Sequence, residues 1–221
     1  MDIQHTRRSS LQTVGTFVPP IPQYLLRMTE QELLSLFRSS GALLDGHFRL
    51  TSGLHSPHYF QCAKVLQYPA NTERLCGVIA SAFLGRRIDA VVAPALGGIV
   101  VGQEVGRALG VRTMFTERKD GSMQLRRGFA ITPGEQVVVC EDVVTTGGSV
   151  FEVIEIVRSA GGIVAGVGYI VDRSGGSVRF PVRAPADQVA LLHMNVVAYS
   201  PEECPLCAAG VPVVKPGSRS T

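Results

Sequence analysis

After residue 87 the chain alternates short apolar runs with glycine-containing turns and helical stretches, and this order restricts the fold more than any other feature of the sequence. The apolar runs, which have the length of buried strands, are 88–93, 111–115, 136–140 and 163–171. The stretches 99–109 and 149–160 predict amphipathic helices that end at glycine. Repeated strand, turn and helix predict βαβ units, so we expect an α/β fold in which helices flank a central, mainly parallel sheet.

Composition excludes several classes of protein. The 221 residues are 45% hydrophobic and 18% charged, which excludes a disordered chain, and a net charge of +3 is too small to predict binding to nucleic acid. The longest apolar stretch, 90–101, is shorter than the ~20 residues that span a bilayer, and we expect no secretory signal. Five cysteines, an odd number spread along the chain, predict a reducing, cytoplasmic compartment and no membrane partner.

The segment from Val137 to Ser149 carries the strongest chemical signal. Four apolar residues lead to Glu141 and Asp142, and a Thr- and Gly-rich turn then opens directly into a helix. Backbone N–H groups, three hydroxyls and the helix N-terminus form an anion site suited to a phosphate. Because carboxylates repel phosphate, the acid pair predicts a sugar phosphate whose hydroxyls donate to the acids. The alternative is a strand-to-helix turn in which Asp142 only caps the helix.

This segment resembles the phosphoribosyl-pyrophosphate signature of the type I phosphoribosyltransferases. The resemblance implies the fold of that family, with a small N-terminal hood, and acids that bind ribose hydroxyls beside a turn that binds the 5′-phosphate. The residues implied to bind phosphoribosyl pyrophosphate are Glu141, Asp142, Val143, Val144, Thr145, Thr146, Gly147, Gly148 and Ser149. Mg²⁺ is implied as a cofactor that arrives on the pyrophosphate, without a ligand from any side chain.

Residues 46–60 resemble the hood of the orotate phosphoribosyltransferases. The matching positions are Phe48, Leu50, Ser52, Gly53, Ser56, Pro57, Tyr59 and Phe60. The resemblance implies that Arg173, at the end of the last strand, binds the orotate carboxylate and that Thr145 also reaches the base. The implied reaction joins orotate to phosphoribosyl pyrophosphate and gives orotidine 5′-phosphate and pyrophosphate, in de novo pyrimidine (UMP) biosynthesis. From its residues alone, 46–60 is either a polar-aromatic loop over a flat ligand or a β-hairpin with a Ser-Gly turn.

The polar and charged stretch 116–128 predicts a mobile loop. The resemblance implies that this loop closes over the pyrophosphate and is shared across a homodimer. Its catalytic cations would be Lys119 and Arg118, with Arg126 or Arg127 as further candidates, whereas a solvated surface loop is the alternative for each of them. At two positions where the family frequently has Lys, this chain has Thr51 and Gly97 instead. The loop 116–128 also contains no His.

The resemblance covers residues 29–200, which we expect to form a phosphoribosyltransferase domain with its hood at about 29–68 and its core at about 70–175. Residues 1–28 are expected as a flexible N-terminal extension and 201–221 as a C-terminal extension. Two other functions stay open. A purine phosphoribosyltransferase would lack the hood match and the carboxylate-binding Arg, and a non-catalytic sensor of phosphoribosyl pyrophosphate would carry a nucleic-acid-binding module or a basic face.

Some cysteines and histidines have no role in this interpretation. Cys204 and Cys207 form a lone CxxC, and two incidental thiols in a turn are favoured over a zinc site because no second pair exists in the chain. A dimer that brings two such pairs together is the other possibility. His47, His55 and His58 lack the helical spacing of a metal site and are expected on the hood surface, with His55 or His58 as a minor candidate for ligand contact. The other three cysteines are expected in the core.

Overall fold

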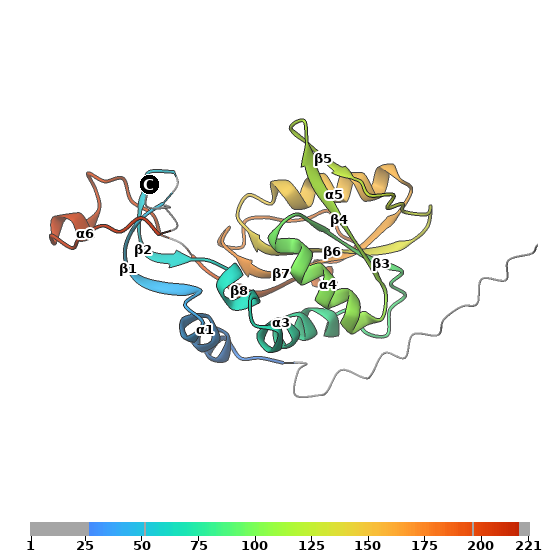
Figure 1. Ribbon diagram of the computed structural model, residues 1–221, viewed down its shortest axis with the longest axis horizontal. Coiled ribbons are helices and arrows are strands. Elements are labelled where there is room, and N and C mark those ends of the chain that lie inside the picture. The colour runs from blue at the N-terminus through green and yellow to red at the C-terminus, as the bar shows by residue number, and fades with distance from the viewer. Residues whose placement is uncertain (1–26, 51, 196, 217–221) are drawn as a thin grey trace, which may run out of the picture.

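The computed structural model describes residues 27–50, 52–195 and 197–216. It has a central six-stranded sheet and, to one side of it, a separate two-stranded hairpin (Figure 1). The strands are β1 (Leu43–Arg49), β2 (His55–Phe60), β3 (Ala90–Pro94), β4 (Arg112–Lys119), β5 (Ser122–Leu125), β6 (Gln136–Val144), β7 (Ile163–Asp172) and β8 (Gln188–His193). The helices are α1 (Glu30–Ser39), α2 (Ala63–Leu66), α3 (Pro69–Ser81), α4 (Gly97–Leu109), α5 (Gly148–Ser159) and α6 (Pro205–Ala208), and a 3₁₀ turn covers Pro185–Asp187.

The order of the strands determines where a ligand can enter. Across the central sheet the order is β5-β4-β3-β6-β7-β8, and every neighbouring pair is parallel except β4 and β5. The chain moves outward from β3 to β4 on one side, and from β6 through β7 to β8 on the other. β3 and β6 therefore flank a topological switch point, where the loops beyond the carboxyl ends of the strands diverge and leave a crevice.

Both faces of the sheet are buried by apolar residues at alternate strand positions. Val91 and Val138 pack in a core shared with α1, α3 and α4. Val92 and Val139, the next residue in each strand, pack in a second core with α5. This alternation follows from the two-residue period of a strand. Helices therefore cover both faces of a mainly parallel sheet, which confirms the predicted fold class (Figure 1).

The hood is built from the β1–β2 hairpin and the C-terminal segment, residues 199–216 (Figure 1). The C-terminal segment pairs with both outer edges of the hairpin. Val214 donates its N–H to the carbonyl of His47 at 2.8 Å, and Tyr199 exchanges two hydrogen bonds of 2.8 Å with His55. An isolated two-stranded hairpin is marginally stable in water, so these added pairings are part of what holds the hood together.

Most elements predicted from the sequence are confirmed, with ends shifted by a few residues. Residues 46–60 take the hairpin form that was the alternative to an open loop, although Thr51 lies outside the described residues. Most of the expected N-terminal extension, 1–26, also lies outside them. In the part of the chain that the structure covers, no helix is long and apolar enough to cross a membrane.

The stretch 116–128, predicted as a mobile loop, contains regular structure that was not predicted from the sequence. β4 continues through Lys119 and pairs with β5 across a two-residue turn. That turn is Asp120-Gly121, and both residues have positive φ angles, 52° and 84°. Asp-Gly with this backbone is a preferred connection between antiparallel strands. The stretch is thus a β-hairpin that projects from the edge of the sheet (Figure 1).

Three glycines at four-residue spacing bring α4 close to the sheet. Gly98, Gly102 and Gly106 lie on one face of the helix. A Cβ atom on Gly102 would lie 2.8 Å from the Cβ of Ala93 in β3, and one on Gly106 would overlap the hydroxyl of Thr113 in β4. The bare backbone therefore packs closer than a side chain would permit, and the N-terminus of α4 reaches the switch point.

We expect Gly102→Ala to lower the free energy of unfolding by about 1–3 kcal/mol, because Ala93 is fully buried and has no room to move aside. The higher helix propensity of alanine opposes this effect but is worth only about 1 kcal/mol. Gln103→Ala, at an exposed position of the same helix, should change stability by less than about 0.5 kcal/mol. Urea unfolding measures both variants, and a stabilised Gly102→Ala protein would contradict the close packing.

Candidate active site

The turn predicted to bind phosphate lies at the carboxyl end of β6. The strand ends at Val144 and α5 begins at Gly148, so residues 145–149, called here the phosphate loop, pass directly into the helix. Gly147 has a φ of 77°, in the left-handed region that favours glycine. The loop lines a cavity of about 220 Å³ together with Val143, Val144, Val150, Arg118, Glu141 and Glu152. An anion in this cavity meets the positive end of the α5 dipole.

Among the residues predicted for phosphoribosyl pyrophosphate, Asp142 alone does not line this cavity. It faces the turn between β3 and α4 instead. A Cβ atom on Gly97 would overlap the Asp142 carboxylate, and one on Gly98 would lie 2.9 Å from Oε1 of Glu141. Bare backbone is therefore required opposite the acid pair. A lysine at position 97, where the resembling family often has one, has no room beside this arrangement of Asp142.

The carboxylates of Glu141 and Asp142 lie close to each other at the end of β6. Glu141 is 9% exposed, and its Oε1 accepts the N–H of Asp142 at 2.9 Å. Oδ1 of Asp142 accepts the N–H of Val143, also at 2.9 Å. Burial, followed by the charge of Asp142, raises the pKa of Glu141 well above its ordinary value. The pair is therefore suited to a ligand that donates hydroxyl hydrogen bonds or brings positive charge.

Arg173 lies at the end of β7, beside the phosphate loop. Its backbone N–H donates to the carbonyl of Val144 at 2.8 Å. Its side-chain Nε is buried and has no hydrogen-bond partner within the described residues. Burial lowers the pKa of the guanidinium, and the Tyr59 phenol of the hood offsets part of this effect. An unsatisfied buried donor costs about 1–3 kcal/mol, so the site favours a ligand with an anionic acceptor between hood and core.

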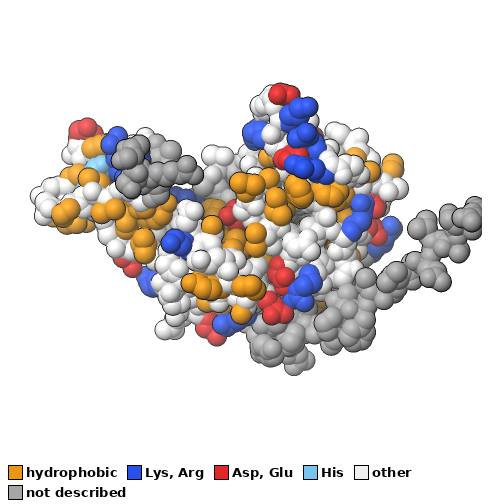
Figure 2. Space-filling view, in the orientation of Figure 1, with side chains coloured by type: hydrophobic (Ala, Val, Ile, Leu, Met, Phe, Trp, Pro, Cys, Tyr) orange, Lys and Arg blue, Asp and Glu red, His pale blue; other side chains and the backbone are white. Residues whose placement is uncertain are grey.

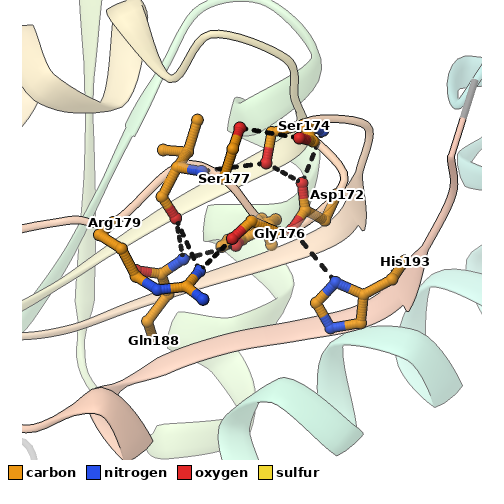
Figure 3. Close-up of polar contacts among 9 residues, drawn as sticks. Asp172, Ser174, Gly176, Ser177, Arg179, Gln188 and His193 are labelled. Atoms are coloured by element: carbon orange, nitrogen blue, oxygen red, sulfur yellow. Dashed lines mark hydrogen bonds and ion pairs between the residues drawn. The ribbon is translucent and has the colours of Figure 1, made fainter.

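The turn that follows Arg173 is held by a buried carboxylate (Figure 3). Asp172 is 1% exposed and accepts hydrogen bonds from the N–H of Ser174 at 2.7 Å and from its hydroxyl at 2.6 Å. Nδ1 of His193, on β8, lies 3.1 Å from the other carboxylate oxygen. Burial raises the pKa of Asp172, but these hydrogen bonds outweigh burial and hold the pKa below its ordinary value. The backbone on both sides of Arg173 is thereby ordered.

The β4–β5 hairpin carries the predicted catalytic cations, and Figure 2 shows Lys and Arg side chains gathered on it. Arg118 lines the cavity and forms an ion pair with Glu152 of α5 at 2.6 Å. Lys119 is the next residue in β4, and side chains alternate along a strand, so Lys119 belongs to the opposite face of the hairpin. The two cations are therefore not equivalent with respect to this cavity.

The other two loop cations are engaged elsewhere. Arg126 and Arg127 both form ion pairs with Glu117 at 3.0 Å, and neither lines the cavity. The charges of these arginines hold the pKa of Glu117 below its ordinary value, with the hydrogen bond from Arg127 as the largest cause. These ion pairs stabilise the end of the hairpin nearest the sheet.

The expectation of surface histidines is wrong for two of the three histidines of the hood. His47 and His55 are buried, at 3% and 6% exposed, whereas His58 is exposed as predicted. Cys204 and Cys207 approach the two buried histidines, and four potential metal-ligand atoms, one from each, lie within 4.8 Å of one another. The other three cysteines are buried, as predicted.

Comparisons with known proteins agree with the fold and with one family. A model of the phosphoribosyl transferase domain matches residues 67–190. The orotate phosphoribosyltransferase of Chlorobaculum parvum is 61% identical over 193 residues, which are 87% of this chain and 98% of that protein. The crystal structure of orotate phosphoribosyltransferase from Aeropyrum pernix is 26% identical, covers 73% of this chain and 93% of its own, and has a TM-score of 0.61.

The fold by itself does not determine the base that is used. The crystal structure of an adenine phosphoribosyltransferase from Thermoanaerobacter pseudethanolicus also matches, with a TM-score of 0.51. It is 19% identical and covers 62% of this chain and 88% of its own, which shows the shared fold alone. The distinction between bases therefore depends on the close relatives and on the residues of the hood and of the β7 end.

We expect Glu141→Gln to stabilise the free protein at neutral and alkaline pH. With a raised pKa, folded Glu141 keeps a proton that the unfolded chain releases above about pH 4.3, so the stability of the wild type falls as the pH rises above that value. Glutamine has no proton to release. The difference in Tm between variant and wild type should therefore grow from about pH 5 to about pH 8.

Thermal unfolding over this pH range measures the effect. Glu155→Gln, which removes an exposed carboxylate from α5, is the matched control and should show no such growth with pH. A Tm difference for Glu141→Gln that stays constant over the whole range would contradict the raised pKa.

Proposed function

This chain belongs to the orotate phosphoribosyltransferase family, and we propose that it transfers the ribose 5-phosphate group of 5-phosphoribosyl 1-pyrophosphate to orotate. The products are orotidine 5′-phosphate and pyrophosphate, and the reaction belongs to de novo pyrimidine biosynthesis. Relatives that carry this name match 87% of the chain at 50–61% identity, which supports the proposal. We place the reaction in the cytoplasm, a location that five free cysteines support.

Phosphoribosyl pyrophosphate fits along the switch point. The phosphate loop offers backbone N–H groups and three hydroxyls to the 5′-phosphate, next to the N-terminus of α5. Glu141 and Asp142 accept hydrogen bonds from the ribose hydroxyls. The pyrophosphate then extends from the ribose toward the turn between β3 and α4, on the other side of the switch point.

The single observation that carries the choice of orotate is the buried Nε of Arg173, for which the described residues offer no hydrogen-bond partner. Orotate differs from uracil chiefly by a carboxylate, and a guanidinium can bind a carboxylate through two parallel hydrogen bonds. Tyr59 of the hood lies near enough to Arg173 to affect the pKa of its guanidinium. The flat base therefore has a place between the hood and the end of β7. Thr145, in the phosphate loop, is the residue proposed to reach the base from the core side.

In the proposed mechanism a ring nitrogen of orotate displaces pyrophosphate from C1 of the ribose. Positive charge develops on the ribose ring, next to the acid pair, and negative charge on the leaving pyrophosphate. The hard oxygen donors of Glu141 and Asp142 suit a hydrated Mg²⁺ carried by the substrate. When bound, Mg²⁺ neutralises charge on the departing pyrophosphate. Closure of the β4–β5 hairpin would exclude water from the site.

The β4–β5 hairpin suggests that Arg118 and Lys119 act in different active sites of a homodimer. Arg118 lines the cavity of its own chain, held there by Glu152. Lys119 belongs to the other face of the same strand. We propose that Arg118 serves the site of its own subunit and that Lys119 serves the site of the partner subunit. The projection of the hairpin from the sheet supports a reach of this kind (Figure 1).

Arg173→Ala should reduce kcat/KM for orotate by about ten- to a hundred-fold, because a charged hydrogen bond is worth about 1.5–3 kcal/mol. Affinity for phosphoribosyl pyrophosphate alone should hardly change, since its phosphate lies in the phosphate loop. Arg173→Lys should recover only part of the loss, because an ammonium cannot make the two parallel contacts. Spectroscopic turnover assays and calorimetric titration provide the two measurements.

Arg179→Ala is the matched control for this test. Arg179 is an exposed arginine on the same turn and donates to the backbone carbonyls of Gly176 and Val178, so its removal should leave kcat/KM within about twofold. If Arg173→Ala weakened phosphoribosyl pyrophosphate as strongly as orotate, Arg173 would bind phosphate and the case for orotate would lose its main support.

Mixed dimers test the division between the two cations. Lys119→Ala and Asp142→Asn should each be nearly inactive alone, and mixing them should restore activity if Lys119 acts across the dimer. Half of the dimers would be mixed, each with one intact site, so about a quarter of wild-type activity is expected. Arg118→Ala mixed with Asp142→Asn should restore none, because Arg118 acts in its own subunit. Restored activity with Arg118→Ala, and none with Lys119→Ala, would contradict the proposal that Lys119 acts across the dimer and Arg118 within its own subunit.

A further inference from the structure

Four side chains that bind metals well meet in the hood, away from the proposed substrate site. Two belong to the β1–β2 hairpin and two to the CxxC around α6. The residues, called here the hood cluster, are His47, His55, Cys204 and Cys207. Three of them are buried, and Cys207 alone is exposed. More than a hundred residues of chain separate the two pairs, and the pairing of the C-terminal segment with the hairpin brings them together.

Four distances between ligand atoms of the hood cluster are close to those of a tetrahedral site. A zinc ion bound at about 2.0 Å from nitrogen and about 2.3 Å from sulfur holds its ligand atoms about 3.3–3.8 Å apart. Sγ of Cys204 lies 3.5 Å from Nε2 of His47, and Sγ of Cys207 lies 3.7 Å from the same nitrogen. Nδ1 of His55 lies 3.2 Å from Sγ of Cys207 and 2.9 Å from Nε2 of His47. All four ligand atoms lie within 4.8 Å of one another, so side-chain shifts of up to about 1 Å would complete the geometry.

The protonation of His47 follows from its second contact. Nδ1 lies 2.7 Å from the carbonyl oxygen of Val211, which can only accept, so Nδ1 carries the proton and Nε2 presents a lone pair to the cluster. A metal-binding histidine usually donates its other N–H to a carbonyl or carboxylate in this way, which orients the ring.

Hydrogen bonding alone does not satisfy the cluster. Nε2 of His47 has one lone pair, yet Nδ1 of His55 and both sulfur atoms converge on it. A cation at the centre of the cluster would bind all four ligand atoms at the same time. Two thiolates with two imidazoles, arranged as a tetrahedron, favour Zn²⁺ over the hard Mg²⁺ of the proposed reaction.

We propose that the hood cluster binds one Zn²⁺ ion in a structural Cys₂His₂ site that anchors the C-terminal segment to the hood. All four positions are filled by protein atoms, which is typical of structural and not of catalytic zinc. The ion joins both strands of the hairpin to the segment that pairs with their outer edges. A small sheet with few buried residues gains much of its stability from such a link.

Metal binding to the full-length protein tests the proposal directly. The protein is stripped with a chelator in the presence of a phosphine reductant and then titrated with Zn²⁺ alone or Co²⁺ alone. We expect one zinc per chain by elemental mass spectrometry, unaffected by excess Mg²⁺. Cobalt should give the visible bands of a tetrahedral ion together with a thiolate charge-transfer band. Uptake of less than a tenth of an equivalent, or a cobalt spectrum without the thiolate band, would overturn the proposal.

Variants then identify the ligands. Cys204→Ser combined with Cys207→Ser should lose the charge-transfer band and weaken zinc binding by at least about 100-fold. His47→Gln should weaken it and change the visible bands. His58→Gln removes an exposed histidine from the same hairpin and should bind zinc as the wild type does. Unchanged zinc affinity in the double cysteine variant would overturn the assignment.

Hydrogen exchange tests the anchoring role in the wild type. Removal of zinc should speed exchange at the N–H groups of Tyr199 and Val214, which pair with the hairpin, and leave the β6–β7 ladder unchanged. Equal exchange at Tyr199 and Val214 with and without zinc would show that the ion does not anchor the segment.

Discussion

The contact between the acid pair of β6 and the bare backbone of the β3–α4 turn is the constraint from which the rest of the site follows. Gly97 and Gly98 leave no side chain opposite Glu141 and Asp142, so the carboxylates occupy the space that a side chain would need. The glycine face of α4 permits this, because it lets the helix pack directly on β3 and β4. Close packing of a helix on a sheet thus sets where the proposed pyrophosphate and ribose can lie.

The groups that are suited to a ligand lower the stability of the free protein. Glu141 is buried beside a second acid, and its pKa is raised in consequence. Arg173, which directly follows the neighbouring strand β7, has a buried donor without a partner in the part of the chain that the structure describes. Both groups are compensated by the same proposed substrates, one through hydroxyls and Mg²⁺ and the other through a carboxylate. The apolar strands around them, buried on both faces, supply the stability that such a site requires.

The parts of the site that could be predicted from the sequence are those that lie together in the chain. The phosphate loop is one continuous segment, and its chemistry follows from a strand end, two glycines and a helix start. The β4–β5 hairpin was missed although Asp120-Gly121 is a strong hairpin signal, because the charge of the stretch was taken as the sign of a loop. The hood cluster could not be found by spacing, since it depends on Tyr199 and Val214 pairing with a hairpin far away in the chain.

The hood and the proposed orotate site are joined along the chain by the segment that follows β8. Asp172 holds the turn after Arg173 and contacts His193, the last residue of β8, and six residues later Tyr199 pairs with His55 of the hood. The same short stretch therefore connects the guanidinium of the core with the strand that carries Tyr59. Anchoring of the C-terminal segment to the hood would therefore restrict movement of Tyr59 relative to Arg173. In this view the proposed zinc ion does no chemistry on the substrate, and it acts by fixing the width of the space in which the base is bound.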